Sequence, residues 1–561
     1  MMEAACAFGD IVARVRKGEV PRPEEVLSFL SVAARTERAQ RLSALSEAFF
    51  EAGNIEQAAR LVRRAIAVSG YDLRYLEPCV ALLSRIGDIE GVRETLKRVG
   101  INAAKENRVV EALELFNRSI YAYATHCKQD RYVYDFEMLA AIDAMALRLR
   151  DTNLPVRAEG RIRVAVLVFG ALHVGSVLIK ILATFAEHAE RSRFELAFFV
   201  PELWHAVLRS KSAKKQLGSL RGAGWTVHIP HTGDPLKVLL DTSSAISKWG
   251  PDVLLTSALC ADLRHYFIAS MHPAPKTIAL VQGPPPQFTV PWVDWNIAVS
   301  AHPGMDTPGN CSVVPLEFPL PDRGSIELMA REQYGLVPGN KVIASGGRPS
   351  KFESADHWRV VGEVLARRPE AVYLAIGLSE LPPAALACLP GDLASRVRLV
   401  AWRDDYLRVI GFADVVLDTY PSGGGVVLLD AMALGIPVVS MANDYLHEFD
   451  QTDWGLGTEF VTISDLVAPR HDFVRQVEIV DRLLEDQTYR ARLGRECEAL
   501  VRSQRGSPAR MISRWEEVLV EVIEQPQTAV SMGPRPAHAP SSGARLDWLL
   551  RWLRGSEGAS R

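Results

Sequence analysis

Short, continuous apolar runs alternate with amphipathic helical stretches from residue 161 onward, and this alternation limits the fold more than any other feature of the chain. Such runs, separated by helices, are typical of parallel strands that helices cover on both faces. They form two series: residues 161–169, 194–200, 225–229, 253–256, 277–281 and 295–299, and then residues 342–345, 371–376, 397–400, 414–417, 437–440 and 460–461. We therefore predict two doubly wound α/β domains, at residues 160–320 and 324–525, whose facing carboxyl edges form a ligand cleft.

The segments beside these domains differ in composition. Residues 151–155 are the predicted linker before the first domain, and the proline-rich residues 315–323 are the predicted hinge between the two. Amphipathic periodicity predicts one long helix at residues 474–500 and a further helix after Pro508. These helices are expected to close the second domain.

The first 150 residues have helical periodicity and almost no strand signals. Gly53 and Gly87, each followed by Asn or Asp, lie 34 positions apart, which is the tetratricopeptide period. A third helical hairpin at residues 106–116 breaks this spacing. We predict N-terminal helices at residues 1–40 and tetratricopeptide-like repeats at residues 41–150, which would present a concave surface to a protein partner. A plain helical bundle that serves as a support is the alternative.

The bulk composition excludes several classes of protein. Lys and Arg number 64 against 67 Asp and Glu, and this near balance argues against nucleic acid as the main partner, although it leaves room for a local basic groove. The seven cysteines lie far apart without a CxxC pair, which argues against a zinc knuckle or a disulfide framework, and no metal site is predicted. The N-terminus has no secretory apolar segment, and the most apolar window, residues 164–185, contains His173 and Lys180. A cytoplasmic protein is expected.

The C-terminal tail, residues 526–561, has a composition of its own. Residues 526–543 are rich in Pro, Ser, Ala and Gly, which is typical of a flexible linker. Residues 545–554 then form a short basic amphipathic pattern, which predicts a helix. That helix suits peripheral contact with a partner or a membrane surface, and it equally suits packing on its own protein.

The most specific motif extends from Phe412 to Ser440 and predicts a strand, a glycine turn, a helix and a second strand. Consecutive glycines let the backbone approach a ligand closely, and the following helix directs free N–H groups and its positive dipole end at the turn. We predict a diphosphate site there, with Asp430 placed in the helix to accept ribose hydroxyls. Asp418 is expected to hold the turn and not to contact substrate. The predicted lining residues of the turn are Ser422, Gly423, Gly424 and Gly425.

These motifs, taken in order, resemble those of GT-B glycosyltransferases, and more narrowly those of the O-linked N-acetylglucosamine transferase family, in which tetratricopeptide repeats precede two facing Rossmann-like domains. The resemblance covers roughly residues 40–520. Residues 163–173 resemble the family's first strand and its active-site histidine, and residues 271–283 with 293–298 resemble its R-P-A-P-x-Q…G-x-P-G…D-Y stretch. Residues 345–351 resemble the turn whose lysine grips donor phosphates, and residues 401–406 fall where the family holds the nucleotide base.

The resemblance implies a hexosyltransferase that needs neither metal nor cofactor and inverts the anomeric centre. It would move GlcNAc from UDP-GlcNAc to Ser or Thr of a protein held by the repeats, and in a bacterial setting a surface protein such as flagellin is a plausible acceptor. His173 would lie beside the attacking hydroxyl, and Lys351 with Arg348 would grip the diphosphate. The base would be held by Ala401, Arg403 and Tyr406.

The chain departs from the family pattern at two places. Val426 and Val427 stand where the family usually has two threonines, so phosphate binding must depend on backbone N–H groups, Lys351 and Arg348. Residues 284–286 are three prolines in place of the family's turn, which affects acceptor placement.

Two alternative functions remain open. One is a transferase that acts on a glycan or lipid, with the tail helix as a membrane tether. The other is a repeat scaffold with a degenerate transferase half. The two valines favour the scaffold, whereas the joint presence of Lys351, Asp430 and His173 opposes it. Asp252 follows a proline at a strand start, a common structural position, and is not assigned as the base.

Overall fold

The computed structural model describes residues 2–31, 33–126, 135–150, 160–168, 177–257, 262–281, 292–299, 309–420, 423–442 and 460–525. The chain divides into two compact units, and the division falls within two helices, α7 (Val109–His126) and α8 (Phe136–Leu149). Over the described residues, the first unit comprises the chain up to Tyr123 together with Phe136–Ala141, and the second comprises the end of α7 from Ala124 onward, Asp135, and the chain from Ile142 onward. The predicted tail helix at residues 545–554 lies outside the described residues.

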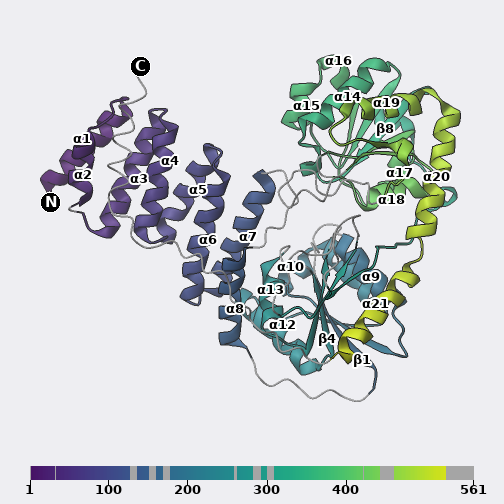
Figure 1. Ribbon diagram of the computed structural model, residues 1–561, viewed down its shortest axis with the longest axis horizontal. Coiled ribbons are helices and arrows are strands. Elements are labelled where there is room, and N and C mark those ends of the chain that lie inside the picture. Colours follow the sequence, from purple (N-terminus) through teal and green to yellow (C-terminus); the bar gives the residue numbers. More distant parts are fainter. Residues whose placement is uncertain are drawn as a thin grey trace. The chain divides into compact units, whose positions relative to one another are not determined.

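The first unit is a series of helices, as the sequence predicts, and its described residues contain no strand (Figure 1). The helices are α1 (Met2–Arg16), α2 (Pro23–Ser31), α3 (Arg35–Glu51), α4 (Ile55–Ser69), α5 (Leu76–Arg85), α6 (Ile89–Lys105) and α7 (Val109–His126), followed by the start of α8. Gly53 and Gly87 have positive φ angles of 79° and 75° and end the first helix of a pair. Asn54 and Asp88 then cap the second helix by accepting backbone N–H groups. The glycine-plus-cap pattern therefore marks the helix turns correctly.

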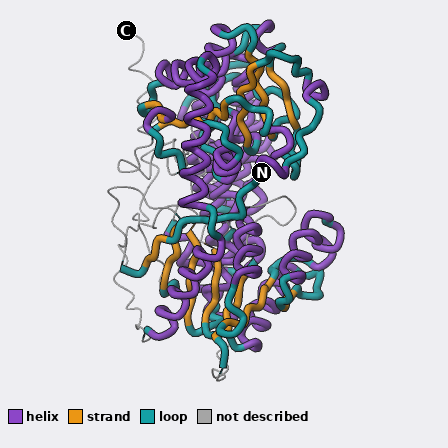
Figure 2. The backbone as a smooth tube through the Cα atoms, turned by 90° about the vertical axis from the view of Figure 1, so that its right-hand side faces the viewer, coloured by secondary structure: helices purple, strands orange, loops and turns teal. Residues whose placement is uncertain are grey.

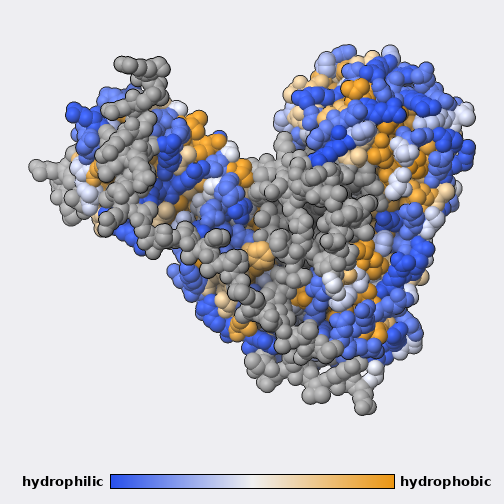
Figure 3. Space-filling view, viewed as in Figure 1, coloured by the Kyte–Doolittle hydropathy of each residue, from blue (hydrophilic) through white to orange (hydrophobic). Residues whose placement is uncertain are grey.

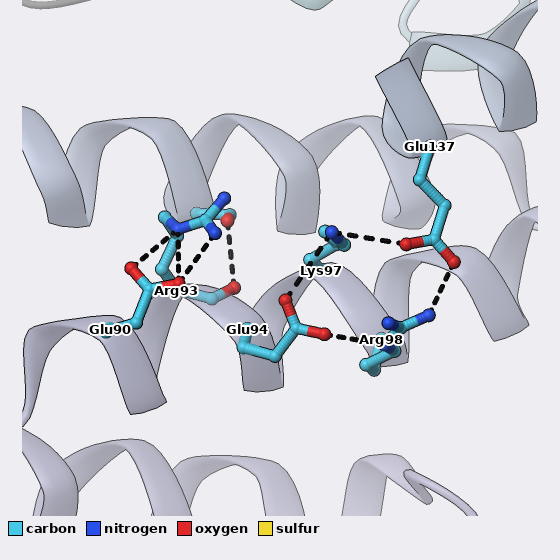
Figure 4. A network of polar contacts seen from close by, with 7 residues as sticks. Glu90, Arg93, Glu94, Lys97, Arg98 and Glu137 are labelled. Atoms are coloured by element: carbon cyan, nitrogen blue, oxygen red, sulfur yellow. Dashed lines mark hydrogen bonds and ion pairs between the residues drawn. The ribbon is translucent and has the colours of Figure 1, made fainter. Parts of the chain in front are cut away.

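An ion network joins α8 to α6 in this unit (Figure 4). Lys97 of α6 is 8% exposed and lies between Glu94, at 3.5 Å, and Glu137 of α8, at 3.2 Å. Arg98 pairs with the same two carboxylates. Because both cations share both acids, Glu137 fixes the start of α8 on α6 more firmly than one exposed pair would.

The second unit contains two parallel sheets, in which helices alternate with strands (Figure 2). The first sheet has the order β3-β2-β1-β4-β5-β6-β7, and all of its pairs are parallel. Its strands are β1 (Ile162–Leu167), β2 (Phe194–Phe199), β3 (Thr226–His228), β4 (Val253–Ser257), β5 (Lys276–Val281), β6 (Trp295–Ala298) and β7 (Cys311–Val313). Its helices are α9 (Val177–His188), α10 (Trp204–Arg209), α11 (Lys211–Gly222), α12 (Pro235–Trp249) and α13 (Leu263–Ser270).

The second sheet repeats this arrangement with the order β10-β9-β8-β11-β12-β13, again parallel throughout. Its strands are β8 (Lys341–Gly346), β9 (Ala371–Ile376), β10 (Val397–Val400), β11 (Val415–Leu417), β12 (Val438–Met441) and β13 (Val467–Ala468). Its main helices are α14 (Ala355–Arg367), α17 (Leu407–Ile410), α18 (Val426–Ala433), α19 (Phe473–Glu485) and α20 (Gln487–Arg505). Every predicted apolar run corresponds to a strand except residues 460–461, which are irregular, while the last strand of the sheet lies at Val467–Ala468 instead. The prediction of two doubly wound sheets is confirmed.

The structure corrects two details of the second unit. The single helix expected at residues 474–500 is two helices, because Asp486 has extended backbone angles and caps α20 by accepting the Tyr489 N–H at 2.9 Å. The sequence also gives no signal for β7, which is only three residues long and half-buried over two of them.

The last helix, α21 (Pro508–Glu524), was expected to close the second domain, but it packs against α9 of the first sheet (Figure 1). Trp515 meets Phe185 edge to face at 5.6 Å, and the Glu516 carboxylate accepts the Glu190 N–H at 2.7 Å. Within the predicted hinge, Glu317 is 3% exposed, and it accepts two donors from Arg510. These contacts tie the start of α21 to the segment that links the sheets.

Candidate functional site

Each sheet has one point at which the strand order reverses, and in open α/β sheets ligands bind at the carboxyl ends of the strands beside that point. In the second sheet it lies between β8 and β11. The chain leaves β8 at Gly346 and enters the turn that carries Lys351, and it leaves β11 toward the glycine turn. The tertiary structure therefore brings the two most specific predicted motifs to one place.

The glycine turn is held from inside by Asp418, which is 2% exposed. One carboxylate oxygen accepts the Gly424 N–H at 2.6 Å, and the other accepts the Ser440 hydroxyl at 2.8 Å. The expectation that Asp418 holds the turn is therefore confirmed. It follows that the Gly424 N–H, predicted as a donor to the ligand, is directed into the protein.

The glycines of the turn differ in their surroundings. A Cβ atom at Gly424 would lie 2.9 Å from side-chain atoms of Leu428 and Val427, whereas one at Gly425 would meet nothing within 4 Å. Gly424 is thus required by packing, and Gly425 borders open space. Gly425 is also the N-cap residue of α18, and no side chain caps that helix end. The uncapped N–H groups and the positive dipole end at this point suit an anion.

Lys351 lies in η4 (Pro349–Phe352), the 3-10 helix just after β8, and its Nζ donates a hydrogen bond to the carbonyl of Gly423, 72 residues away. Two glycines make room for this arrangement. A Cβ atom at Gly347 would lie 2.9 Å from Cδ of Lys351, and one at Gly377 would lie 1.9 Å from the Gly347 carbonyl oxygen. Gly377, which has a φ of 112°, is a supporting residue that the sequence prediction missed. Its signal was a glycine directly after the apolar run at 371–376. Arg348, the second predicted cation, is exposed.

Asp430 and Tyr406 were predicted separately and form a pair. The Tyr406 hydroxyl donates a hydrogen bond to the Asp430 carboxylate, which is 4% exposed. Burial raises the pKa of Asp430, while the charge of Lys180 and the Tyr406 hydrogen bond act in the opposite direction. Burial also raises the pKa of Tyr406 well above its ordinary value, and the neighbouring carboxylate adds to this. Lys180 had no assigned role, because nothing in the local sequence of α9 connects it with Asp430.

The segment predicted to hold a base, residues 401–406, follows β10. Arg403 donates to both oxygens of Asp405, at 2.6 and 2.8 Å, and to the Tyr334 hydroxyl at 2.7 Å. These contacts fix the guanidinium within the segment. Ala401 is exposed, and the indole of Trp402 beside it is 54% exposed.

Other predicted residues lie elsewhere. His173 and Ser422 are outside the described residues, as are the prolines 284–286. Asp252 accepts the Arg163 N–H at 2.9 Å at the amino end of β4, which is the structural role expected of it. Over the described ranges there is no cluster of three or more His, Cys, Asp or Glu side chains that could hold a metal ion.

No helix in the part of the chain that the structure describes is both long and apolar enough to span a membrane. On the face drawn in Figure 3, hydrophobic side chains are interspersed with hydrophilic ones.

Comparison with known proteins identifies the architecture. No protein-family model matches the chain, and no curated protein matches it in sequence. Among solved structures, a mutant of the O-GlcNAc transferase from Thermobaculum terrenum is similar with a TM-score of 0.52 and 20% identity, over 93% of this chain and 98% of that one. A glycosyltransferase from Rickettsia africae has a TM-score of 0.48 and 11% identity, over 65% of this chain and all (100%) of that one. The first likeness establishes the GT-B fold.

Proposed function

We propose that this chain is a glycosyltransferase that moves a sugar, by default GlcNAc, from a UDP-sugar to a Ser or Thr hydroxyl of a protein acceptor. The observation that carries the proposal is the position of Lys351. Its ammonium group lies on the Gly423 carbonyl, beside the uncapped N-terminus of α18. A cation and a helix dipole that meet at the switch point of a parallel sheet suit a diphosphate.

The described residues would divide the work on the donor as follows. The diphosphate would lie at the start of α18, where Val426 and Val427 offer only their backbone N–H groups. Lys351 would turn from the Gly423 carbonyl to the diphosphate and neutralise the charge that develops as it leaves. The ribose hydroxyls would take the place of the Tyr406 hydroxyl on Asp430, since that carboxylate already accepts a hydroxyl donor.

The proposal for how the acceptor hydroxyl reacts is based on the sequence. The acceptor oxygen would attack the anomeric carbon as the bond from that carbon to the phosphate oxygen breaks, and the diphosphate would take up the electron pair. His173 keeps the role predicted from the sequence, beside the attacking hydroxyl, where an imidazole could accept the proton. The proposed reaction is inverting and independent of metal, and the helical unit would hold the protein acceptor in the cytoplasm.

Titration of UDP-GlcNAc by isothermal calorimetry tests the donor site. The wild-type chain should bind saturably, and Lys351→Ala should weaken binding by about 10- to 100-fold, because a charge-assisted contact is worth about 1.5–3 kcal/mol. Lys248→Ala removes an equally charged group from the exposed face of α12 and is the matched control. A wild-type chain without saturable binding would favour the scaffold.

Transfer is tested with a tagged UDP-GlcNAc and whole cell lysate. Label in the protein fraction supports the proposed acceptor class, whereas label in the lipid or glycan fraction favours the alternative transferase. Undiminished transfer by Lys351→Ala would contradict the assignment of the phosphate site.

A further inference from the structure

A cavity of about 630 Å³ lies at the opposite edge of the second sheet from the glycine turn. Its walls are Leu328, Met329 and Arg331, residues 338–341 and 411–414, and Arg323. Lys341 is the first residue of β8, and Asp414 directly precedes β11. The cavity therefore borders the amino ends of the two strands whose carboxyl ends carry the candidate donor site, so the two sites are distinct.

The side chains that line this cavity carry an excess of positive charge. Arg323, Arg331 and Lys341 line it, and none of the three has a carboxylate within ion-pair distance among the residues that the structure describes. Asp414 is the only acid among the lining residues, and it is fully engaged. One of its oxygens accepts the Val342 N–H at 2.8 Å, and the other pairs with Arg490 at 3.1 Å. The three cations are thus uncompensated, and a concave wall concentrates their field.

The cations are partly held in place. Arg331 donates to the Asn340 carbonyl at 3.4 Å and lies over the Phe412 ring at 5.8 Å. Arg323 donates to the Leu434 carbonyl at 3.2 Å. A guanidinium carries five N–H donors, so each arginine keeps several for a ligand. Because these side chains are already ordered, less conformational entropy is lost when an anion binds.

We propose that this cavity binds a small, soluble anion of the phosphate class with more than one negative charge. Arginine forks match phosphate oxygens in geometry, and the volume lies within the range of about 300–1,000 Å³ that is usual for small-molecule sites. Leu328 and Met329 form an apolar part of the wall, which leaves room for an organic group on the anion. The site goes beyond the proposed transfer reaction and does not depend on it.

Calorimetric titration of the full chain with inorganic tripolyphosphate, at low ionic strength, tests the proposal. The double variant Arg331→Ala with Lys341→Ala should bind at least about tenfold more weakly than the wild type. The control Lys214→Ala with Arg221→Ala removes the same charge from the exposed face of α11 and should bind like the wild type. Because tripolyphosphate also suits the glycine turn, the same titration on Lys351→Ala should retain binding at the cavity.

Folding is checked separately, since Arg331 packs on Phe412. The variant Arg331→Gln with Lys341→Gln removes the same two charges but keeps more of each side chain than alanine does, and it should show the same loss. The proposal is overturned if tripolyphosphate does not bind the wild type, if either double variant binds it like the wild type, or if Lys351→Ala alone abolishes all binding. Binding of phosphoinositide vesicles without binding of free tripolyphosphate would also overturn it. Failure of UDP-GlcNAc to bind leaves these outcomes unchanged, so the two proposals fail independently.

Discussion

The hydroxyl of Tyr406 donates a hydrogen bond to the carboxylate of Asp430, 24 residues further along the chain and almost completely buried. This bond opposes the effect of burial, which raises the pKa of Asp430. It also occupies the carboxylate that the proposed donor ribose would use. The pair therefore links the stability of the second sheet domain to its candidate donor site.

Substitution Tyr406→Phe should lower the free energy of unfolding at pH 7 by about 1.5–3 kcal/mol, because it leaves a buried carboxylate without its donor. The pKa of Asp430, which burial already raises, should rise further in this variant. The folded state with an ionised Asp430 is then less stable relative to the unfolded state. The sign follows from linkage: at a pH below the ordinary carboxyl pKa, Asp430 is protonated in both states and the loss should be smaller. Urea unfolding at pH 7 and at pH 3, which lies below the ordinary carboxyl pKa of 3.8, measures this difference.

Tyr489→Phe is the matched control, since Tyr489 donates to Asp465 at 3.2 Å in an exposed pair. Its cost should stay below about 0.5 kcal/mol. Equal losses from both tyrosines, or a loss at Tyr406 that does not depend on pH, would show that the buried pair has no special role.

Alanine at Gly424 and at Gly425 should have opposite consequences. Gly424→Ala places a methyl group 2.9 Å from Leu428 and Val427, and overpacking of this kind costs about 1–3 kcal/mol of stability. Gly425→Ala meets no atom within 4 Å and should leave the melting temperature unchanged. Its methyl group would project into the opening at α18, so UDP should bind about tenfold more weakly. Unchanged UDP affinity in Gly425→Ala would argue that the diphosphate lies elsewhere.

Val427→Thr should tighten UDP binding by about fivefold, since a neutral hydrogen bond is worth about 1 kcal/mol. Val427 is half-buried in the first turn of α18, and threonine has nearly its shape. Uridine, which lacks the diphosphate, serves as the control ligand and should bind equally to both proteins. If uridine affinity changes as much as UDP affinity, the new hydroxyl does not act on the phosphates.

His357 should make the protein less stable in acid. It is 2% exposed, lies 2.8 Å from the Tyr373 hydroxyl, and burial lowers its pKa from 6.5 to about 4. As the pH falls below 6.5, His357 becomes protonated in the unfolded chain, whereas in the folded chain it stays neutral until about pH 4. Stability is therefore complete above pH 6.5 and falls toward pH 4, by up to about 1.4 kcal/mol per pH unit. His357→Gln should reduce this slope, whereas His205→Gln, at an exposed site, should not.

Much of the fold was predictable because its signals are local. A parallel strand that is buried on both faces must be apolar along its whole length, so β1, β4, β8 and β11 appear in the sequence as continuous runs. The turns after α3 and α5 appear in the sequence as a glycine followed by a capping residue, because a positive φ angle favours glycine and a helix start favours a side chain that accepts N–H groups. Asp486 was missed because one capping residue is a weak signal within a long amphipathic stretch.

The candidate site likewise has some features that local sequence patterns predict and others that they do not. Local sequence patterns were enough to predict that a glycine turn and a helix start follow β11, that a lysine follows β8, and that Asp418 holds the turn. The pairs of groups that meet follow from the three-dimensional arrangement alone: Lys351 with the Gly423 carbonyl, Tyr406 with Asp430, and the Gly424 N–H with Asp418. These pairings depend on how neighbouring strands align at one sheet edge and on which atoms burial turns inward. No local pattern records either, because both are set by contacts between residues far apart in the chain.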